Sequence, residues 1–113
     1  MDAVSLSDSD VVEAIDGVHL AQLAAGEKMS IQHFHIEPGA KVPEHSHPHE
    51  QTGYVTKGTL IFLVDGEEIS VSAGESYVVP GDEPHAAENR GDVPVDGLDI
   101  FSPPRLDVPW MED

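Results

Sequence analysis

The residues best suited to chemistry are the histidines of stretch 39–58, which reads GAKVPEHSHPHEQTGYVTKG. Three of the seven histidines fall here at every second position: His45, His47 and His49. In an extended segment alternate side chains share a face, so His45 and His47 point the same way, about 6.6 to 6.8 Å apart along the strand. If the chain bends slightly between them, both imidazoles reach one ion. The spacing therefore indicates a divalent-metal site.

Further ligands for such an ion are available just after the histidine run. Pro48 interrupts the extended segment, and a turn there could return Gln51 or Glu50 toward the same point. His49 has the strand parity of the other two histidines but follows Pro48, which favours a solvated position at the rim. The chain has no cysteine, so a metal ion must be held by imidazole, carboxylate, amide or water.

Two more histidines share a face of a predicted strand at 29–36. His33 and His35 have the same parity there, so they project to the same side. They could contact the metal or its substrate. Residues of this kind are more often hydrogen-bonded groups on a barrel wall or on the surface, and the sequence leaves both possibilities open.

Short strands account for most of the chain. Residues 59–64 (TLIFLV) are almost continuously apolar, as in a buried strand, and residues 67–72 (EEISVS) alternate, with Ile69 and Val71 facing inward. Asp65-Gly66 between them predicts a type I′ hairpin. Residues 1–16 are compatible with a helical turn or an added strand, and further strands are predicted at 18–23, 29–36, 54–56, 75–79, 86–89 and 95–101. About eight to ten short strands at this spacing predict a small β-barrel or sandwich.

The charge balance is strongly acidic, with 22 Asp and Glu against 5 Lys and Arg and a net charge of -17. A nucleic acid or an anionic membrane surface would require the opposite sign, so we expect neither as a partner. Acidic surfaces of this kind keep proteins soluble in concentrated salt, where a Debye length of about 3 Å at 1 M screens self-repulsion. We therefore predict a protein of a salt-accumulating cytoplasm, with an ordinary acidic protein as the alternative.

The first ten residues, MDAVSLSDSD, carry neither the basic nor the apolar region of a signal peptide. Elsewhere, apolar runs stay well short of the roughly 18 residues that a membrane-spanning helix needs. The sequence therefore predicts neither export nor a membrane span.

Two stretches of the chain resemble the motifs of the cupin family. The first cupin motif is glycine, five residues, His-x-His, three or four residues, Glu, six residues and glycine. The residues that match it here are Gly39, His45, His47, Gln51 in place of Glu, and Gly58.

The second cupin motif is glycine, five residues, Pro-x-Gly, two residues, His, three residues and Asn. It is matched by Gly74, Pro80, Asp82 in place of Gly, His85 and Asn89. Asp82 falls in a turn, where Asp tolerates unusual backbone angles, so this departure does not threaten the fold.

The resemblance implies an all-β fold, the cupin double-stranded β-helix or jelly-roll barrel, as a single domain over 1–113. Residues 1–16 would be an N-terminal extension and 103–113 a C-terminal tail, in which Trp110 packs on the body or on a partner subunit. Small cupins usually dimerise, so a homodimer is expected. The metal ligands implied by the two motifs are His45, His47, Gln51 and His85.

A closer likeness is to the pectin-degradation cupins, metal enzymes that linearise unsaturated uronate monosaccharides. It rests on HSHPHEQ at 45–51 with Gly-Tyr-Val at 53–55, and on DIFSPPR at 99–105. It implies Asp99 as the catalytic residue, with Phe101 and Arg105 as substrate-binding residues. The predicted function is the metal-dependent conversion of an unsaturated galacturonate to its linear ketone form, in pectin and uronate catabolism.

The neutral amide of Gln51 indicates what charge the substrate carries. Three imidazoles and a neutral amide leave a divalent ion its full charge, which favours an anionic sugar acid and Lewis-acid chemistry over an iron centre tuned by carboxylate. These ligands suit one divalent transition-metal ion, Ni, Mn, Zn or Fe, without choosing among them. Two other cupin functions stay open, a small-ligand-binding or regulatory protein without turnover and a metal-dependent dioxygenase.

Overall fold

The computed structural model describes residues 1–106. Within them the regular structure is a short 3-10 helix, η1, and strands β1 to β10. No helix in this part of the chain has the length and apolar character needed to cross a membrane. The bounds are η1 Leu6–Asp8, β1 Val11–Ile15, β2 Val18–Ala25, β3 Ser30–Ile36, β4 Lys41–His45, β5 Glu50–Lys57, β6 Thr59–Val64, β7 Glu67–Ser72, β8 Ser76–Val79, β9 His85–Glu88 and β10 Val95–Ser102.

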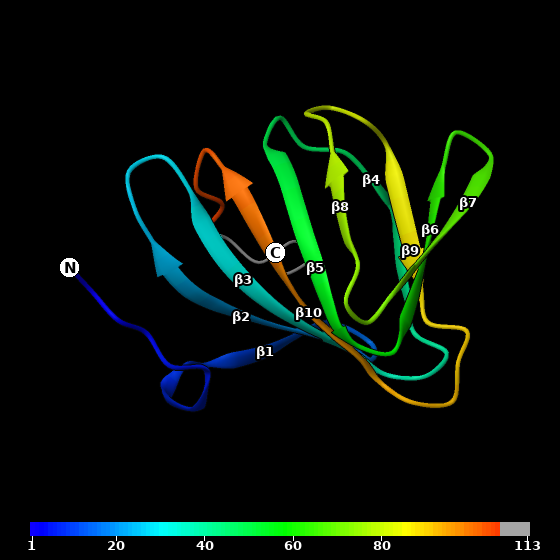
Figure 1. The fold of residues 1–113 in the computed structure, drawn as a ribbon, viewed down its shortest axis with the longest axis horizontal. Helices are drawn as coiled ribbons and strands as arrows, with labels where there is room; N and C mark the ends of the chain where they lie inside the picture. The colour runs from blue at the N-terminus through cyan, green and yellow to red at the C-terminus, as the bar shows by residue number, and fades with distance from the viewer. Residues whose placement is uncertain (107–113) are drawn as a thin grey trace.

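The strands of the described residues form two sheets in which neighbouring strands pair antiparallel. The larger sheet has the order β1-β2-β3-β10-β5-β8, and the smaller has the order β4-β9-β6-β7. Figure 1 shows the larger sheet on the left and the smaller on the right. Because β10 lies between β3 and β5, strands far apart in the sequence become neighbours, as in a jelly roll. The predicted all-β jelly-roll fold is confirmed.

The core lies between the inner faces of the two sheets. Along β3 burial alternates, with Phe34 and Ile36 inside and His33 and His35 on the other face, as the two-residue period of a strand requires. The same alternation runs along β5 and β10. The buried cluster consists of Ala14, Val18, Leu20, Phe34, Ile36, Val55, Leu60, Phe62, Val71, Ala87 and Val95.

The segment 1–16, for which the sequence allowed a helical turn or a strand, contains both, as η1 and β1. The Asp65-Gly66 hairpin is confirmed, since the φ angles of 51° and 78° at these residues are both positive. Ile69 and Val71 lie on the inner face, opposite Phe62 and Leu60 of β6, but only Val71 is buried, at 4% exposed, whereas Ile69 is 48% exposed. Ile69 lies nearer the hairpin tip, where packing against the core ends.

Candidate functional site

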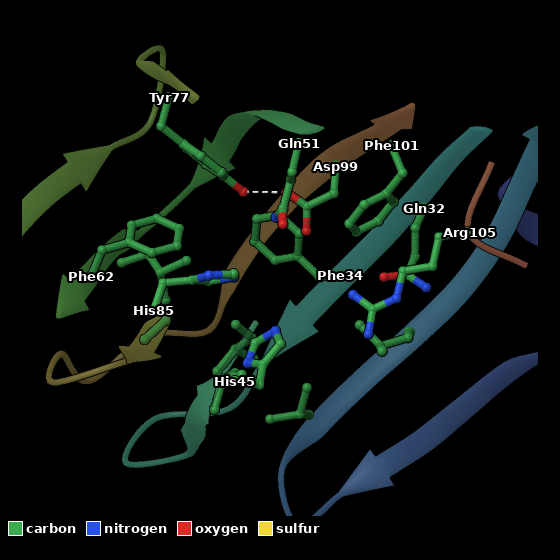
Figure 2. A pocket seen from close by; sticks show the side chains of 16 residues that line it. Gln32, Phe34, His45, Gln51, Phe62, Tyr77, His85, Asp99, Phe101 and Arg105 are labelled. Carbon is green, nitrogen blue, oxygen red and sulfur yellow. Dashed lines mark hydrogen bonds between the residues drawn. The ribbon is translucent and has the colours of Figure 1, made fainter. Parts of the chain in front are cut away.

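A cavity opens between the two sheets and receives side chains from both of them. Figure 2 shows His45 and His85 on one side of it and Asp99, Phe101 and Arg105 on another. Apolar core residues line much of its wall, and its volume is about 60 Å³. Its polar lining residues are Gln32, His45, Gln51, Tyr77, His85, Asp99 and Arg105.

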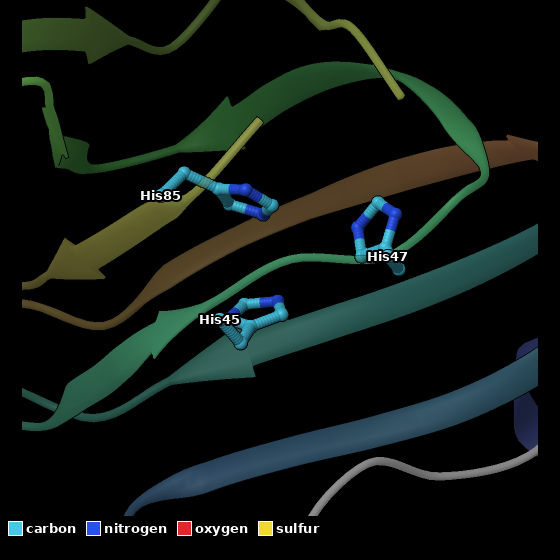
Figure 3. Close-up of side chains that lie close together, drawn as sticks. All are labelled: His45, His47 and His85. Carbon is cyan, nitrogen blue, oxygen red and sulfur yellow. The ribbon is translucent and has the colours of Figure 1, made fainter. Parts of the chain in front are cut away.

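Three histidines converge at this cavity. His45 ends β4 and pairs directly across the sheet with His85, the first residue of β9. His47 lies in the loop between β4 and β5, so this loop, and not strand parity, brings it to the other two. One ring nitrogen from each of the three lies within 4.8 Å of the others. Figure 3 shows the three imidazoles turned toward a common point.

Each of these imidazoles is oriented by the main chain. In all three, the Nδ1–H donates to a carbonyl oxygen two residues away, which holds the ring in place and leaves Nε2 with a lone pair. This is the arrangement found around metal-binding histidines. The contacts are His45 Nδ1 to Pro43 O at 2.9 Å, His47 Nδ1 to His49 O at 3.0 Å and His85 Nδ1 to Glu83 O at 2.9 Å.

Gln51 completes a donor set that fits a divalent ion. Its side chain is 5% exposed, and its Oε1 lies 3.0 Å from His47 Nε2. With the His47 proton on Nδ1, His47 Nε2 and Gln51 Oε1 are both acceptors. Two lone pairs that face each other at this distance repel, and a cation between them removes the repulsion. Three imidazole nitrogens and an amide oxygen are ligands suited to Ni, Mn, Zn or Fe.

Burial keeps two of the imidazoles in the neutral form that a metal ligand must have. Desolvation lowers the pKa of His45 to about 4; the Pro43 carbonyl opposes this shift, and the positive charge of Arg105 and the neighbouring His85 add to it. Desolvation is also the main cause that lowers the pKa of His47, followed by the charge of Arg105.

The competing ligands are set apart from this cluster. Glu50 is exposed and is not among the three side chains, His45, His47 and His85, whose ligand atoms converge. The His49 ring centre is 5.6 Å from that of His47 and 6.1 Å from that of Phe101. His33 and His35 lie on the outer face of the larger sheet, away from the cavity. Trp110 lies outside the described residues.

Asp99 is a buried carboxyl on the cavity wall, 9% exposed. The Tyr77 hydroxyl donates to its Oδ1, as the dashed line in Figure 2 shows. Desolvation raises the pKa of Asp99 to about 6, against the lowering effects of Tyr77, Gln51 and Arg105. Burial and the Asp99 charge raise the pKa of Tyr77 well above its usual value, so this hydroxyl keeps its proton. A carboxyl with a pKa near 6 can both give and take a proton near neutral pH.

Sequence reasoning missed Tyr77 and the glycine that lets it reach Asp99. Gly53 in β5 pairs with Tyr77 on one side and with Asp99 on the other. The Tyr77 ring lies over Gly53, where an added Cβ would stand 2.1 Å from Tyr77 Cζ. A glycine inside a strand marks a close approach of this kind, and this was the signal available in the sequence.

Substitution Gly53→Ala is expected to displace the Tyr77 ring and to lower the free energy of unfolding by about 1 to 3 kcal/mol, the usual cost of overpacking. Chemical denaturation measures this change. The matched control is Gly26→Ala, because the nearest atom to an added Cβ there is Met29 O at 3.9 Å. Equal stability of the two variants would contradict the close packing of Tyr77 on Gly53.

Phe101 and Arg105 lie at the same cavity as Asp99. Phe101 is 2% exposed, and its ring centre is 5.6 Å from that of His47. The guanidinium carbon of Arg105 stands 5.3 Å from the Phe101 ring centre. The Arg105 main-chain N–H donates to Ser30 Oγ at 2.9 Å, which ties this segment to β3. The three residues expected at 99–105 therefore face one space.

The sequence matches the family described as "Cupin domain" over residues 32–101, so the chain belongs to the cupin family. Within that family it resembles the pectin degradation protein KdgF. It is 27% identical to KdgF of Dickeya dadantii over 93 residues, which cover 81% of this chain and 84% of that protein. The structure of KdgF from Halomonas sp. superposes with a TM-score of 0.84 at 25% identity, covering 92% of this chain and 96% of that chain.

A second group of relatives belongs to polyketide synthesis. The tetracenomycin polyketide synthase protein TcmJ of Streptomyces glaucescens is 36% identical over 72 residues, which cover 63% of this chain. The chain spans only about half of TcmJ, since the match covers 48% of that protein. The polyketide cyclase RemF of Streptomyces resistomycificus has a TM-score of 0.80 at 20% identity, covering 97% of this chain and 90% of that chain, and shares the fold.

Proposed function

We propose that this cupin is a metal-dependent enzyme that converts an unsaturated galacturonate to its linear ketone form. The observation that carries the proposal is the placement of Asp99, held by Tyr77, in the same cavity as the converging histidines and Arg105. The similarity to KdgF, named as a pectin degradation protein, supports the choice of a uronate as substrate.

His45, His47, Gln51 and His85 are proposed to hold one divalent transition-metal ion. Bound there, the ion would act as a Lewis acid toward the oxygens of an anionic sugar. The residues themselves contribute no negative charge to the ligand set, which leaves the positive charge of the ion available to a uronate.

The proposed role of Asp99 is proton transfer. Ring opening of an unsaturated uronate is formally the hydration of an enol ether, followed by collapse of the hemiketal to a ketone. One ring carbon of the double bond gains a proton, and its neighbour gains the oxygen of water, whose released proton restores the acid. The bond from that neighbour to the ring oxygen then breaks, and the proton of the new hydroxyl passes to the ring oxygen. In this proposal Asp99 supplies the proton, while Tyr77 and Gln51 hold its carboxyl by hydrogen bonds.

Arg105 and Phe101 are proposed to position the sugar. A guanidinium offers two parallel N–H donors to a carboxylate, and this grip sets orientation as well as affinity. Phe101 gives the ring an apolar wall between Arg105 and His47. Loss of either side chain would weaken substrate binding more than metal binding, because neither belongs to the proposed ligand set.

The TcmJ similarity favours a second candidate function, a reaction on an aromatic polyketide in the same cavity. The apolar part of the wall would suit such a ligand. The polar side chains in the lining, Asp99 and Arg105 among them, favour the sugar acid.

The proposal is tested by the ultraviolet absorbance of the enol ether of an unsaturated galacturonate. The absorbance should fall faster with protein than in buffer when Ni²⁺, Mn²⁺, Zn²⁺ or Fe²⁺ is supplied, and chelation should remove the difference. If none of the four ions produces any acceleration, the proposed reaction is wrong. Steady-state binding of an aromatic polyketide in place of the sugar would then favour the second candidate.

A further inference from the structure

A second group of histidines and carboxylates lies on the outer face of the larger sheet. His19 in β2 pairs directly with His35 in β3, and His35 pairs with Asp96 in β10, so the three form one row across the strands. Glu37 follows the end of β3 and reaches back to the same row. This group, with Leu6 and Val11 from the N-terminal segment, lines a depression separate from the cavity.

Two pairs of atoms in this group have the spacing of ligands on one metal ion, and Glu37 is common to both pairs. Glu37 Oε2 lies 3.5 Å from His19 Nε2 and 3.3 Å from His35 Nε2. Ligands held at about 2.0 to 2.2 Å around a tetrahedral zinc ion are about 3.3 to 3.6 Å apart. The rings of His19 and His35 have centres 5.7 Å apart. Both side chains are partly exposed, at 27% and 34%, and rotation of the His19 ring can bring its Nε2 closer to that of His35.

Asp96 orients the central histidine. Its Oδ1 lies 2.6 Å from His35 Nδ1, so the imidazole donates there and keeps the Nε2 lone pair on the side of Glu37 and His19. A carboxylate behind a histidine in this way fixes the ring and raises its basicity as a ligand. His33 is placed differently, with its Nε2 4.0 Å from Asp96 Oδ1.

We propose that His19 Nε2, His35 Nε2 and Glu37 Oε2 form a second site for a divalent transition-metal ion such as Zn²⁺. Asp96 supports this site through His35, and water takes the remaining position. The carboxylates of Glu37 and Asp96 together balance the charge of a dication, whereas the ligand set in the cavity has no carboxylate. The site joins β2, β3 and the segment that follows β3, so occupation should stabilise the fold.

The test is the number of Zn²⁺ ions retained per chain after equilibrium dialysis in about 0.5 M KCl, which screens weak binding to surface carboxylates. The variant His45→Gln/His85→Gln removes two proposed cavity ligands, and it should retain one Zn²⁺. Adding His19→Gln/Glu37→Gln to it should remove that ion. Adding His33→Gln instead, the matched control, should leave the ion bound.

Thermal unfolding gives a second readout on the same variants. Zn²⁺ should raise the melting temperature of His45→Gln/His85→Gln and of its His33→Gln control, and should not raise that of the variant that also carries His19→Gln/Glu37→Gln. The proposal is overturned if His45→Gln/His85→Gln retains no Zn²⁺, or if its ion survives the loss of His19 and Glu37. Two of the three cavity histidines, His45 and His85, are absent throughout, so failure here is distinct from failure of the proposed reaction.

Discussion

Substitution His85→Ala is expected to lower the affinity of the cavity for Ni²⁺ by about 100-fold or more, because it removes one of three convergent imidazole nitrogens. His85 is 3% exposed, and its Nδ1 already donates to Glu83 O. Within the described residues the converging group consists of His45, His47 and His85, so the substitution leaves two imidazole ligands. Titration against a competing chelator measures the effect, in a His19→Gln/Glu37→Gln background that removes the proposed outer site.

The matched control for this prediction is His49→Ala. His49 lies beside His47, with ring centres 5.6 Å apart, yet it is outside the group of three converging nitrogens. Its removal should change Ni²⁺ affinity by no more than about threefold, less than the loss of a supporting contact causes. A large loss in His49→Ala together with a small one in His85→Ala would mean that the ligand set is assigned wrongly.

Substitution Asp99→Asn is expected to lower kcat on an unsaturated galacturonate by about 10² to 10⁴, the usual contribution of a positioned acid or base. The amide keeps the shape of the carboxyl and can accept the Tyr77 hydroxyl, but it cannot transfer the proton. Metal affinity should stay within a few fold, since Asp99 is not in the proposed ligand set. Initial rates and Ni²⁺ titration on the same preparation separate the two effects. Unchanged kcat would assign the proton transfer elsewhere.

The same variant has a stability signature that checks its fold. The pKa of Asp99 rises from 3.8 to about 6 on folding, so the native state binds more protons than the unfolded state between these values. Protonation of Asp99 therefore contributes to the free energy of unfolding below about pH 4. This contribution, up to about 3 kcal/mol for metal-free protein, is lost as the pH rises through 6. Asp99→Asn should not show this loss. Urea unfolding of both proteins at pH 4 and 7.5 gives the comparison.

Much of the architecture could be predicted from local patterns. The strands at 59–64 and 67–72 have the predicted bounds, because a continuous apolar run and an alternating run flank an Asp-Gly pair. Strand parity also predicted that His33 and His35 share a face. It could not say which face, since that depends on the strands that pack against β3, and the structure places both outside.

The site was predictable only in part, for a physical reason. His45, His47 and Gln51 lie close together in the sequence, whereas His85 comes to them through the pairing of β4 with β9. Only the likeness to the cupin motifs indicated that pairing. For Tyr77 the only signal was Gly53 inside a strand, and that glycine does not say which side chain approaches it, because the approach of Tyr77 to Asp99 depends on the register of β8 against β5. A local sequence pattern does not determine how one strand is aligned with its neighbour, so contacts that depend on this alignment cannot be predicted from it.

The most direct test of the proposed function is the appearance of the ring-opened ketone by NMR when an unsaturated galacturonate is mixed with protein. Metal-free protein, the same protein reconstituted with Ni²⁺, and buffer with Ni²⁺ alone are followed side by side. The proposed function predicts that the ketone forms fastest with reconstituted protein, and at the buffer rate once the ion is removed. Formation at the buffer rate by protein whose cavity holds its metal ion would contradict it.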